Sequence, residues 1–573
     1  MRLTHWIMGA AAATIAVSAM SRSAGPSQAA PGPVYLSQGP DWGPAARASF
    51  YSMDQGSEIM PLSWARALGT PDGAPFLGDR LARYGYLDNG PGAELPVGFT
   101  AGTRGGVAYL GMTCAACHTR QIDVGGTAYR IDGGPALSDF QSFLHDLDAA
   151  VGQVLATDAA FQAFADRALG AGATAADRAG LRQQVAAWYR RQHTLFARAL
   201  PAEPWGVGRL DAVSMILNRV TGLDIGPAPD GVIEPNIMAA DAPVRYPFIW
   251  DAPKQDRTQW PGFASNGDAL LAVARNLGEV YGVFADFHPV KNGSPLGWDY
   301  HSRNSADFGG LGRLEGLVRR IGPPAWPWPI DAGRVTRGQL VFQQQCSGCH
   351  GISQGALRLV PVSTTWRTQL VDVGTDTREY DVLKRRGDSG VLRGARYDPG
   401  HGLAAQDDQF RILSAAVIGS MTDCFVRFCL PIGTLAGPIR LGGAPKPSTV
   451  HDELAGAYHA DEFRQAAASE RHPYEARVLR GIWATAPYLH NGSVASLAEL
   501  LTKPEDRLAA FPVGPAYDPD AIGLAAAQPG APHLRQTTGC DDLHSGNSRC
   551  GHRYGTGLAA DQKRDLLEYL KTL

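Results

Sequence analysis

The pentapeptide Cys-x-x-Cys-His occurs twice in this 573-residue chain, and no other feature constrains the fold as strongly. The copies are Cys114-Ala115-Ala116-Cys117-His118 and Cys346-Ser347-Gly348-Cys349-His350. With 8 Cys and 15 His, roughly 0.003 matches are expected by chance. Two thiols at this spacing reach both vinyl-derived carbons on one edge of a porphyrin, and the following histidine can bind the iron. The sequence therefore predicts two covalently bound haems c, with His118 and His350 as iron ligands.

A zinc site or a redox-active Cys pair is the alternative explanation of each motif. Zinc requires further Cys or His close by, and neither motif has a second pair beside it. The two motifs lie 232 positions apart, which is far more than a small cytochrome domain spans. We therefore expect each haem to occupy its own domain.

The N-terminus has the pattern of a secretory signal peptide. Arg2 and His5 precede an apolar run from Trp6 to Val17, and small residues follow. The run is shorter than the ~20 residues that cross a bilayer, and no later apolar stretch is long enough. We expect residues 1–30 to be cleaved, leaving a periplasmic or secreted protein with no integral membrane segment.

The four remaining cysteines suit an exported chain. Cys424 with Cys429 and Cys540 with Cys550 are the simplest disulfide pairs, although the sequence leaves other pairings open. Lys plus Arg number 52 and Asp plus Glu number 55, which gives a formal net charge of -3. There is no basic excess for nucleic acid, so we expect no nucleic-acid partner.

Hydrophobic periodicity predicts a mainly α fold with two class I cytochrome c-like haem domains, long loop-rich insertions and few short strands. A strand is expected at 127–131, with helices from about 138, over 175–200, over 208–220 and over 558–573. A short helix is expected at 338–342, before the second motif. The proline-rich stretch 322–329 is the best domain boundary, dividing an N-terminal haem domain (31–321) from a C-terminal one (322–573).

The second axial ligand decides what each haem does, because an iron with one protein ligand keeps a face open for an oxidant. His490 and His552 both lie in glycine-rich segments of the C-terminal half, and each either binds iron or has a structural role. No comparable histidine follows the first motif, because His145 and His193 lie on predicted helices. This asymmetry predicts that haem 1 is open and reactive and that haem 2 transfers electrons.

The chain resembles the bacterial di-haem cytochrome c peroxidase and MauG superfamily, and is most similar to the rubber oxygenase (RoxA-like) branch. The resemblance runs from about residue 105 to the C-terminus. It is carried by the segments 112–119, 130–136, 208–212, 246–251, 483–493 and 551–556.

The resemblance implies roles for single residues. Trp250 corresponds to the tryptophan that relays electrons between the haems. His552 corresponds to the distal ligand of haem 2 and His490 to a residue near that haem, with the reverse assignment as the alternative. The pocket over haem 1 is expected near Ile216, Ile249, Ala264 and Ser265; Ser265 stands where rubber oxygenases have a bulky aromatic, although Phe263 is close. A calcium ion between the haem domains occurs in relatives.

The resemblance also implies an oxidoreductase in which haem 1 activates O2 or peroxide. The second substrate is then an apolar alkene, as in an oxygenase (dioxygenase), or a small redox protein donor, as in a peroxidase. A non-catalytic di-haem electron-transfer cytochrome is the alternative function.

Overall fold

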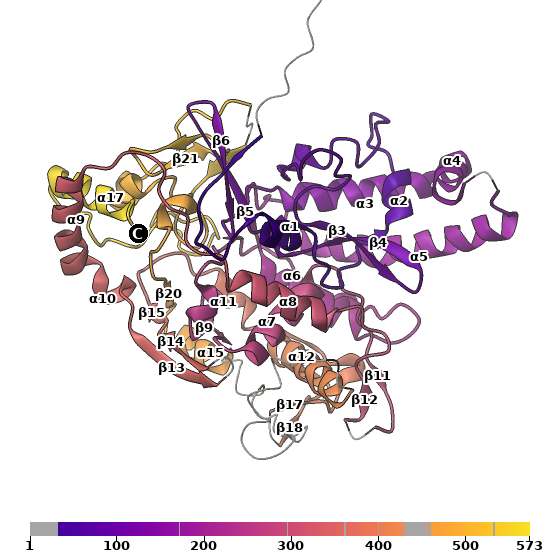
Figure 1. The fold of residues 1–573 in the computed structure, drawn as a ribbon. Coiled ribbons are helices and arrows are strands. Elements are labelled where there is room, and N and C mark those ends of the chain that lie inside the picture. Colours follow the sequence, from indigo (N-terminus) through magenta and orange to yellow (C-terminus); the bar gives the residue numbers. More distant parts are fainter. Residues whose placement is uncertain are drawn as a thin grey trace, which may run out of the picture.

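The structure is a computed structural model that describes residues 32–170, 172–294, 296–359, 362–398, 400–427, 460–530 and 533–573, together with Cys429 and Leu454. The predicted signal peptide, residues 1–30, lies outside the described residues. Figure 1 shows α9 and α17 at one end of the molecule, on the left, and α3, α4 and α5 at the other, on the right.

The N-terminal part is built on three helices that pack against one another: α3 (Phe140–Ala156), α4 (Asp158–Leu169) and α5 (Ala175–Ala199). The side chains of Asp139, Thr157 and Thr174 cap their first turns, which satisfies backbone N–H groups that have no partner within the helix. The helix expected from about residue 138 is α3, which begins at Phe140. The helix expected over 175–200 is confirmed as α5.

The other α-helices lie before and after this group. They are α1 (Pro44–Ser52), α2 (Leu62–Ala67), α6 (Ala212–Arg219), α7 (Ala269–Gly282), α8 (Phe308–Val318), α9 (Ala332–Gln345), α10 (Ser347–His350), α11 (Glu379–Val382), α12 (Gln409–Val426), α15 (Ala460–Ala468), α16 (Leu497–Leu500) and α17 (Ala560–Leu570).

The strands form many small sheets. Two sheets have three strands, in the orders β1-β6-β5 and β2-β4-β3: β1 (Val34–Tyr35), β2 (Met60–Pro61), β3 (Phe99–Arg104), β4 (Val107–Met112), β5 (Thr119–Val124) and β6 (Thr127–Asp132). The two-stranded sheets are β7 (Arg209–Leu210) with β8 (Val244–Arg245), β9 (Arg257–Thr258) with β10 (Ala264–Ser265), β11 (Val290–Lys291) with β12 (Trp298–Asp299), β13 (Gln354–Leu359) with β14 (Val362–Trp366), β15 (Gln369–Val371) with β20 (Tyr474–Ala476), β16 (Arg386–Asp388) with β19 (Gln406–Asp408), β17 (Arg396–Asp398) with β18 (His401–Gly402), β21 (Ala510–Pro512) with β24 (Leu534–Gln536), and β22 (Tyr517–Asp518) with β23 (Gly523–Leu524).

The prediction of a mainly α fold is wrong. Helix accounts for 38% and strand for 17% of the structure, with the strands spread over many small sheets. This architecture does not establish two class I cytochrome c domains. Most of the strands are only two or three residues long, too short to display the period-two alternation by which a strand is recognised in a sequence. The strand expected at 127–131 is confirmed as β6.

The helix before the second motif, α9, packs against the C-terminal helix α17. α9 leads directly into Cys346, and its Gly338 lies where an added Cβ would be 1.9 Å from the Asp565 carbonyl oxygen of α17. Phe342 and Tyr569 contact each other beside this crossing, with ring centroids 5.3 Å apart. The helix that precedes the motif is longer than the segment 338–342 and begins at Ala332.

The apolar core does not follow the predicted domain boundary. One cluster of buried side chains combines Leu36, Trp250 and Leu317 from the first predicted haem domain with Trp483 and Leu566 from the second. The proposed division at residue 322 stays a prediction. Within the described ranges, no helix is both long and apolar enough to cross a membrane.

Both local disulfides are present. Cys424 pairs with Cys429 and Cys540 with Cys550, with Cα–Cα distances of 5.1 and 5.0 Å. The free cysteines of the described chain are the four of the Cys-x-x-Cys-His motifs, so disulfide pairing leaves both motifs intact.

Candidate haem sites

The first motif forms a tight turn between β4 and β5. Residues Cys114–Ala116 are one 3₁₀ turn, and the His118 amide donates to the Cys114 carbonyl at 2.9 Å. Gly98 packs so closely beneath this turn that an added Cβ would lie 2.0 Å from the Ala116 nitrogen. The turn brings both thiols and the imidazole to one cavity, cavity 1.

His118 is held with one ring nitrogen free. Its Nδ1 lies 2.9 Å from the Pro247 carbonyl oxygen, and since a carbonyl can only accept, Nδ1 carries the proton. Burial lowers the pKa of His118 to about 4, so the ring is neutral and Nε2 keeps a lone pair for a metal. Burial also raises the pKa of Cys114 and of Cys117 to about 12.

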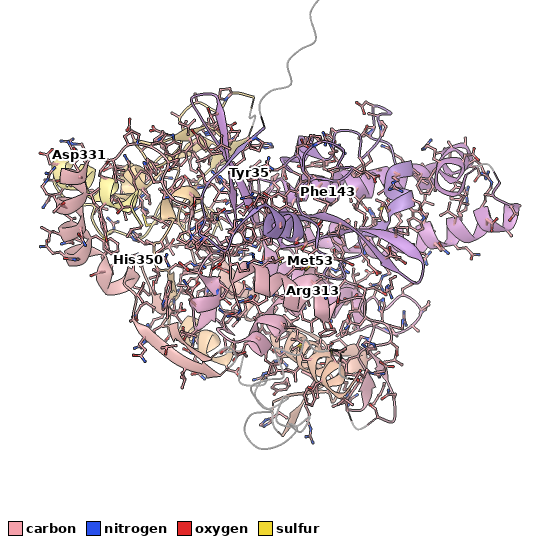
Figure 2. All side chains as sticks on the ribbon, viewed as in Figure 1. Tyr35, Met53, Phe143, Arg313, Asp331 and His350 are labelled. Atoms are coloured by element: carbon pink, nitrogen blue, oxygen red, sulfur yellow. A yellow bond between two sulfur atoms is a disulfide. The ribbon has the colours of Figure 1, made fainter. Side chains whose placement is uncertain are left out.

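The second motif repeats this geometry at the end of a helix. The His350 amide donates to the Cys346 carbonyl at 2.9 Å, and His350 Nδ1 lies 2.7 Å from the Arg477 carbonyl oxygen. Cys346, Cys349 and His350 all line cavity 2. Figure 2 labels His350 at the end of α10, with Asp331 at the far end of α9.

Two more histidines line cavity 2, and they are held differently. The His552 ring faces the His350 ring, with centroids 6.3 Å apart and planes inclined at 41°. The buried Nδ1 of His552 has no hydrogen-bond partner among the described residues. The His490 ring stacks on Tyr474, with centroids 4.0 Å apart and planes inclined at 16°. Burial and the charge of Arg245 lower the pKa of His490 to about 3.

Cavity 1 is lined differently. Its sole histidine, among the described residues, is His118. Four polar side chains line part of its wall, two of them from α7. Gln259 donates to Glu279 of α7 at 3.2 Å, and Arg275 of α7 pairs with Glu315 at 3.0 Å. Burial raises the pKa of Glu279, which favours the protonated carboxyl.

Only two of the four residues expected near haem 1 line cavity 1. Ile216 and Ile249 line cavity 1, as expected from the resemblance. Ala264 and Ser265 do not: they form β10 and pair with β9, while the neighbouring Phe263 packs on Phe410 with ring centroids 4.7 Å apart.

Three residues line both cavities: Phe248, Glu475 and Arg477. Arg477 donates to the Phe248 carbonyl at 2.8 Å and lies over the Phe248 ring, 4.0 Å from its centroid. The Arg477 carbonyl accepts from His350, and the neighbouring Pro247 carbonyl accepts from His118. The sequence predicts no role for any of them: Phe248 lies in the resembling segment 246–251, whereas no motif or spacing distinguishes Glu475 and Arg477.

Trp250 is fully buried and lines neither cavity. It stacks on Phe248 with ring centroids 4.8 Å apart, and its indole N–H donates to the Arg480 carbonyl at 2.8 Å. Of the three residues that line both cavities, Phe248 is the aromatic one, and Trp250 stacks on it.

The residues present fit haem c at both motifs. Each motif offers two unpaired thiols and a neutral imidazole whose free nitrogen can bind iron. Among the described residues, no group of three or more His, Cys, Asp or Glu side chains is arranged to bind a metal ion directly. The calcium ion suggested by the resemblance stays a prediction.

Part of this chain is similar to a known protein family, and most of it is similar to proteins of one bacterium. Residues 473–512, which contain Tyr474, Arg477 and His490, match the family model of RoxA-like, cytochrome c-like domains. The uncharacterized protein y4iM of Sinorhizobium fredii is 24% identical over 57% of this chain and 63% of its own length. The uncharacterized protein y4iJ of the same organism is 30% identical over 93% of this chain and 92% of its own length. The chain therefore belongs to one family with y4iJ, and its RoxA-like, cytochrome c-like segment makes it a protein that carries covalently bound haem c.

Proposed function

We propose that the protein is an exported di-haem c oxidoreductase whose two haems have different tasks. Cys114, Cys117 and His118 would hold haem 1, and Cys346, Cys349 and His350 would hold haem 2. Bound haem c supplies one-electron redox chemistry and, where one axial position is open, a binding site for O2 or peroxide. The cysteine pairs would fix each haem through thioether bonds.

The difference in axial histidines carries this proposal. Two imidazoles that bind one metal ion from opposite sides, at about 2.0–2.1 Å each, have ring centroids about 6 Å apart. The separation of 6.3 Å between His350 and His552 fits that arrangement, whereas His490 is stacked on Tyr474. His552 would therefore hold haem 2 together with His350. Among the described residues, cavity 1 offers only His118 to hold haem 1, so we assign the binding of the oxidant to haem 1.

The polar group in cavity 1 favours peroxide as the oxidant. Reduction of a peroxide consumes two protons, and desolvation raises the pKa of the Glu279 carboxyl, which favours a proton held inside the cavity. Gln259 orients this carboxyl by donating a hydrogen bond, and the Arg275 guanidinium, which pairs with Glu315, places further N–H donors on the cavity wall. Cavity 1 also has apolar walls, including Ile216 and Ile249, so an apolar alkene with O2 is the second candidate substrate pair.

Haem counting and spectroscopy test the proposal. We expect a pyridine haemochrome assay to give two haems c per chain. Electron paramagnetic resonance of the oxidised protein should show one high-spin and one low-spin haem, and CO should bind about half of the reduced haem. Two low-spin signals with no CO binding would instead indicate the non-catalytic electron carrier.

Substrate assays then separate the two enzymes. Turnover of hydrogen peroxide with reduced cytochrome c as donor would support a peroxidase. Cleavage of polyisoprene under air, without peroxide, would support an oxygenase. Replacing Glu279 with Gln keeps a similar shape but removes the acidic proton, so this variant should slow peroxide turnover and leave the haem count at two.

A further inference from the structure

The proline-rich stretch 322–329 places two tryptophans against a third from the C-terminal part. Trp326 contacts Trp483 with ring centroids 5.1 Å apart, and Trp328 contacts Trp326 at 4.7 Å and Trp483 at 5.9 Å. The stretch is fixed in place, because its Gly322 and Ala325 amides donate to the carbonyls of residues 38 and 37. The Trp483 indole donates to the Pro324 carbonyl at 3.2 Å.

The inner end of this aromatic group lies against the residues between the two cavities. Gly481 packs so closely on Trp250 that an added Cβ would lie 3.0 Å from two carbons of its indole ring. Two peptide bonds connect Gly481 to Trp483. Trp250 in turn stacks on Phe248, which lines both cavities. A short path of contacts and covalent bonds thus runs from the cavities to Trp483.

The outer end reaches the protein surface. Trp328 contacts Tyr129 of β6 with ring centroids 5.3 Å apart, and both side chains are partly exposed. β6 pairs with β1, whose Tyr35 is 42% exposed and is labelled in Figure 2. A solvent molecule or a small donor can therefore reach Trp328 and Tyr129.

A nearby positive charge makes Trp326 the least favourable of the three tryptophans for electron transfer. The Lys571 ammonium lies 5.1 Å from the centroid of the Trp326 ring, and a nearby cation disfavours removal of an electron from an indole, although Glu568 partly neutralises it at 2.8 Å. Among the described residues, no Lys or Arg side chain lies over the ring of Trp483 or Trp328 as Lys571 does over Trp326. The direct contact between Trp483 and Trp328 therefore bypasses Trp326.

We infer that Trp483, Trp328 and Tyr129 conduct single electrons from the surface toward the two cavities, and that the donor is a small one-electron reductant, for which a phenol serves as the probe. The inference rests on the proposed function, with a peroxide as oxidant. Each phenol loses one electron to the aromatic path and one proton to water, and becomes a phenoxyl radical. Two phenols supply the two electrons, and two protons from solvent enter with them, so one hydrogen peroxide yields two waters. The path lets the protein oxidise donors that do not enter cavity 1.

Mapping oxidation in the haem-loaded protein tests the inference. Hydrogen peroxide without a donor should leave oxidised Trp328 or Tyr129 in peptides analysed by mass spectrometry, with a transient aromatic radical in freeze-quenched samples. 2,6-Dimethoxyphenol should protect these residues and be oxidised. In Trp328→Phe, which keeps an aromatic ring, we expect oxidation of the phenol to fall at least tenfold while the haem spectrum and the optical response to peroxide stay unchanged.

Trp188→Phe is the matched control. Like Trp328, Trp188 is partly exposed. It belongs to α5, donates to the Ile59 carbonyl and contacts none of the three path residues. The control should oxidise the phenol like the wild type. Two results, each with a normal haem response to peroxide, would overturn the inference but not the proposed function. The first is that Trp328 and Tyr129 stay unmodified, and the second is that Trp328→Phe oxidises the phenol as fast as the wild type. A wild-type protein whose two haems do not respond to peroxide contradicts both the inference and the peroxidase form of the proposed function.

Discussion

At the scale of single residues, backbone placement decides which histidine faces His350. His552 has a φ of +49°, a left-handed conformation that bulky residues rarely adopt. The preceding Gly551 has a φ of +89° and packs so tightly that an added Cβ would lie 2.7 Å from the Thr375 nitrogen. The His552 amide donates to the Val373 carbonyl at 3.1 Å. These contacts hold the imidazole in cavity 2.

Replacing His552 with alanine should therefore open haem 2. We expect its low-spin signal to become high-spin and CO to bind nearly all of the reduced haem instead of about half. His490→Ala should leave the low-spin signal in place, because that ring is stacked on Tyr474. The reverse result, with only His490→Ala converting the signal, would reverse the ligand assignment.

Arg507 is predicted to position His552. This buried guanidinium donates to four backbone carbonyls, those of residues 549, 551, 500 and 552, at 2.7, 2.9, 3.2 and 3.0 Å. Hydrogen bonds from a charged donor contribute about 1.5–3 kcal/mol each, and a neutral side chain cannot replace all of them. Arg507→Gln should lower the free energy of unfolding by about 2–4 kcal/mol and give a high-spin fraction at haem 2.

Added imidazole distinguishes positioning from general loss of structure. It should restore the low-spin signal of Arg507→Gln, and Arg507→Lys should show a smaller high-spin fraction. Arg553→Gln is the control, since Arg553 follows His552 directly but is exposed and pairs with Glu505. A fully low-spin haem 2 in Arg507→Gln would show that this arginine does not position the ligand.

At the scale of elements, the second motif depends on the crossing of α9 and α17. The helices approach most closely at Gly338, where backbone meets backbone. The Asp565 carboxylate on α17 accepts from Arg337 at 2.7 Å and from Arg334 at 3.2 Å on α9. These contacts fix the direction in which α9 delivers Cys346 to cavity 2.

Gly338→Ala should separate the two helices. The added methyl group meets a backbone carbonyl that cannot rotate away, so we expect a loss of about 2–3 kcal/mol in unfolding free energy. Gly316→Ala is the matched control, because Gly316 lies in the exposed face of α8 with no atom within 4 Å of an added Cβ. That change should stabilise the protein by about 0.5–1 kcal/mol. Thermal unfolding followed by circular dichroism measures both, and equal effects would contradict the close crossing.

At the scale of the whole molecule, ion pairs connect segments that are far apart in the sequence. Arg104 at the end of β3 pairs with Glu58 at 2.6 Å and with Asp286, after α7, at 3.1 Å. His288 also pairs with Asp286, at 3.1 Å. Partial burial alone would raise the pKa of Asp286, but the hydrogen bond and charge of His288, together with Arg104, lower it to about 2.

This lowered pKa predicts a loss of stability in acid. A carboxyl whose folded pKa lies below its unfolded value stabilises the fold above about pH 4, and this contribution disappears as the pH falls toward 2. Because the side chain is 38% exposed, solvent screening limits the effect to about 1 kcal/mol or less. Urea unfolding at pH 7 and pH 3 should show a smaller acid loss for Asp286→Asn than for wild type. Asp520→Asn, at an exposed position, is the control and should behave as wild type.

The sequence by itself determined the features that depend on neighbouring residues. A Cys-x-x-Cys-His motif closes one backbone turn, so its thiols and imidazole come together wherever the chain places it. The disulfides close over separations of 5 and 10 residues, and helices such as α5 follow from periodicity over many residues. The two- and three-residue strands leave no such pattern, which is why the predicted fold class was wrong.

Only the tertiary structure decided what surrounds each motif. His118 bonds to a carbonyl 129 positions away and His350 to one 127 positions away. The convergence of Phe248, Glu475 and Arg477 between the cavities, the orientation of His552 toward His350, and the contact of Trp328 with Trp483 likewise join distant segments. No local spacing encodes such contacts, because they arise only when hydrophobic burial packs the whole chain into one structure.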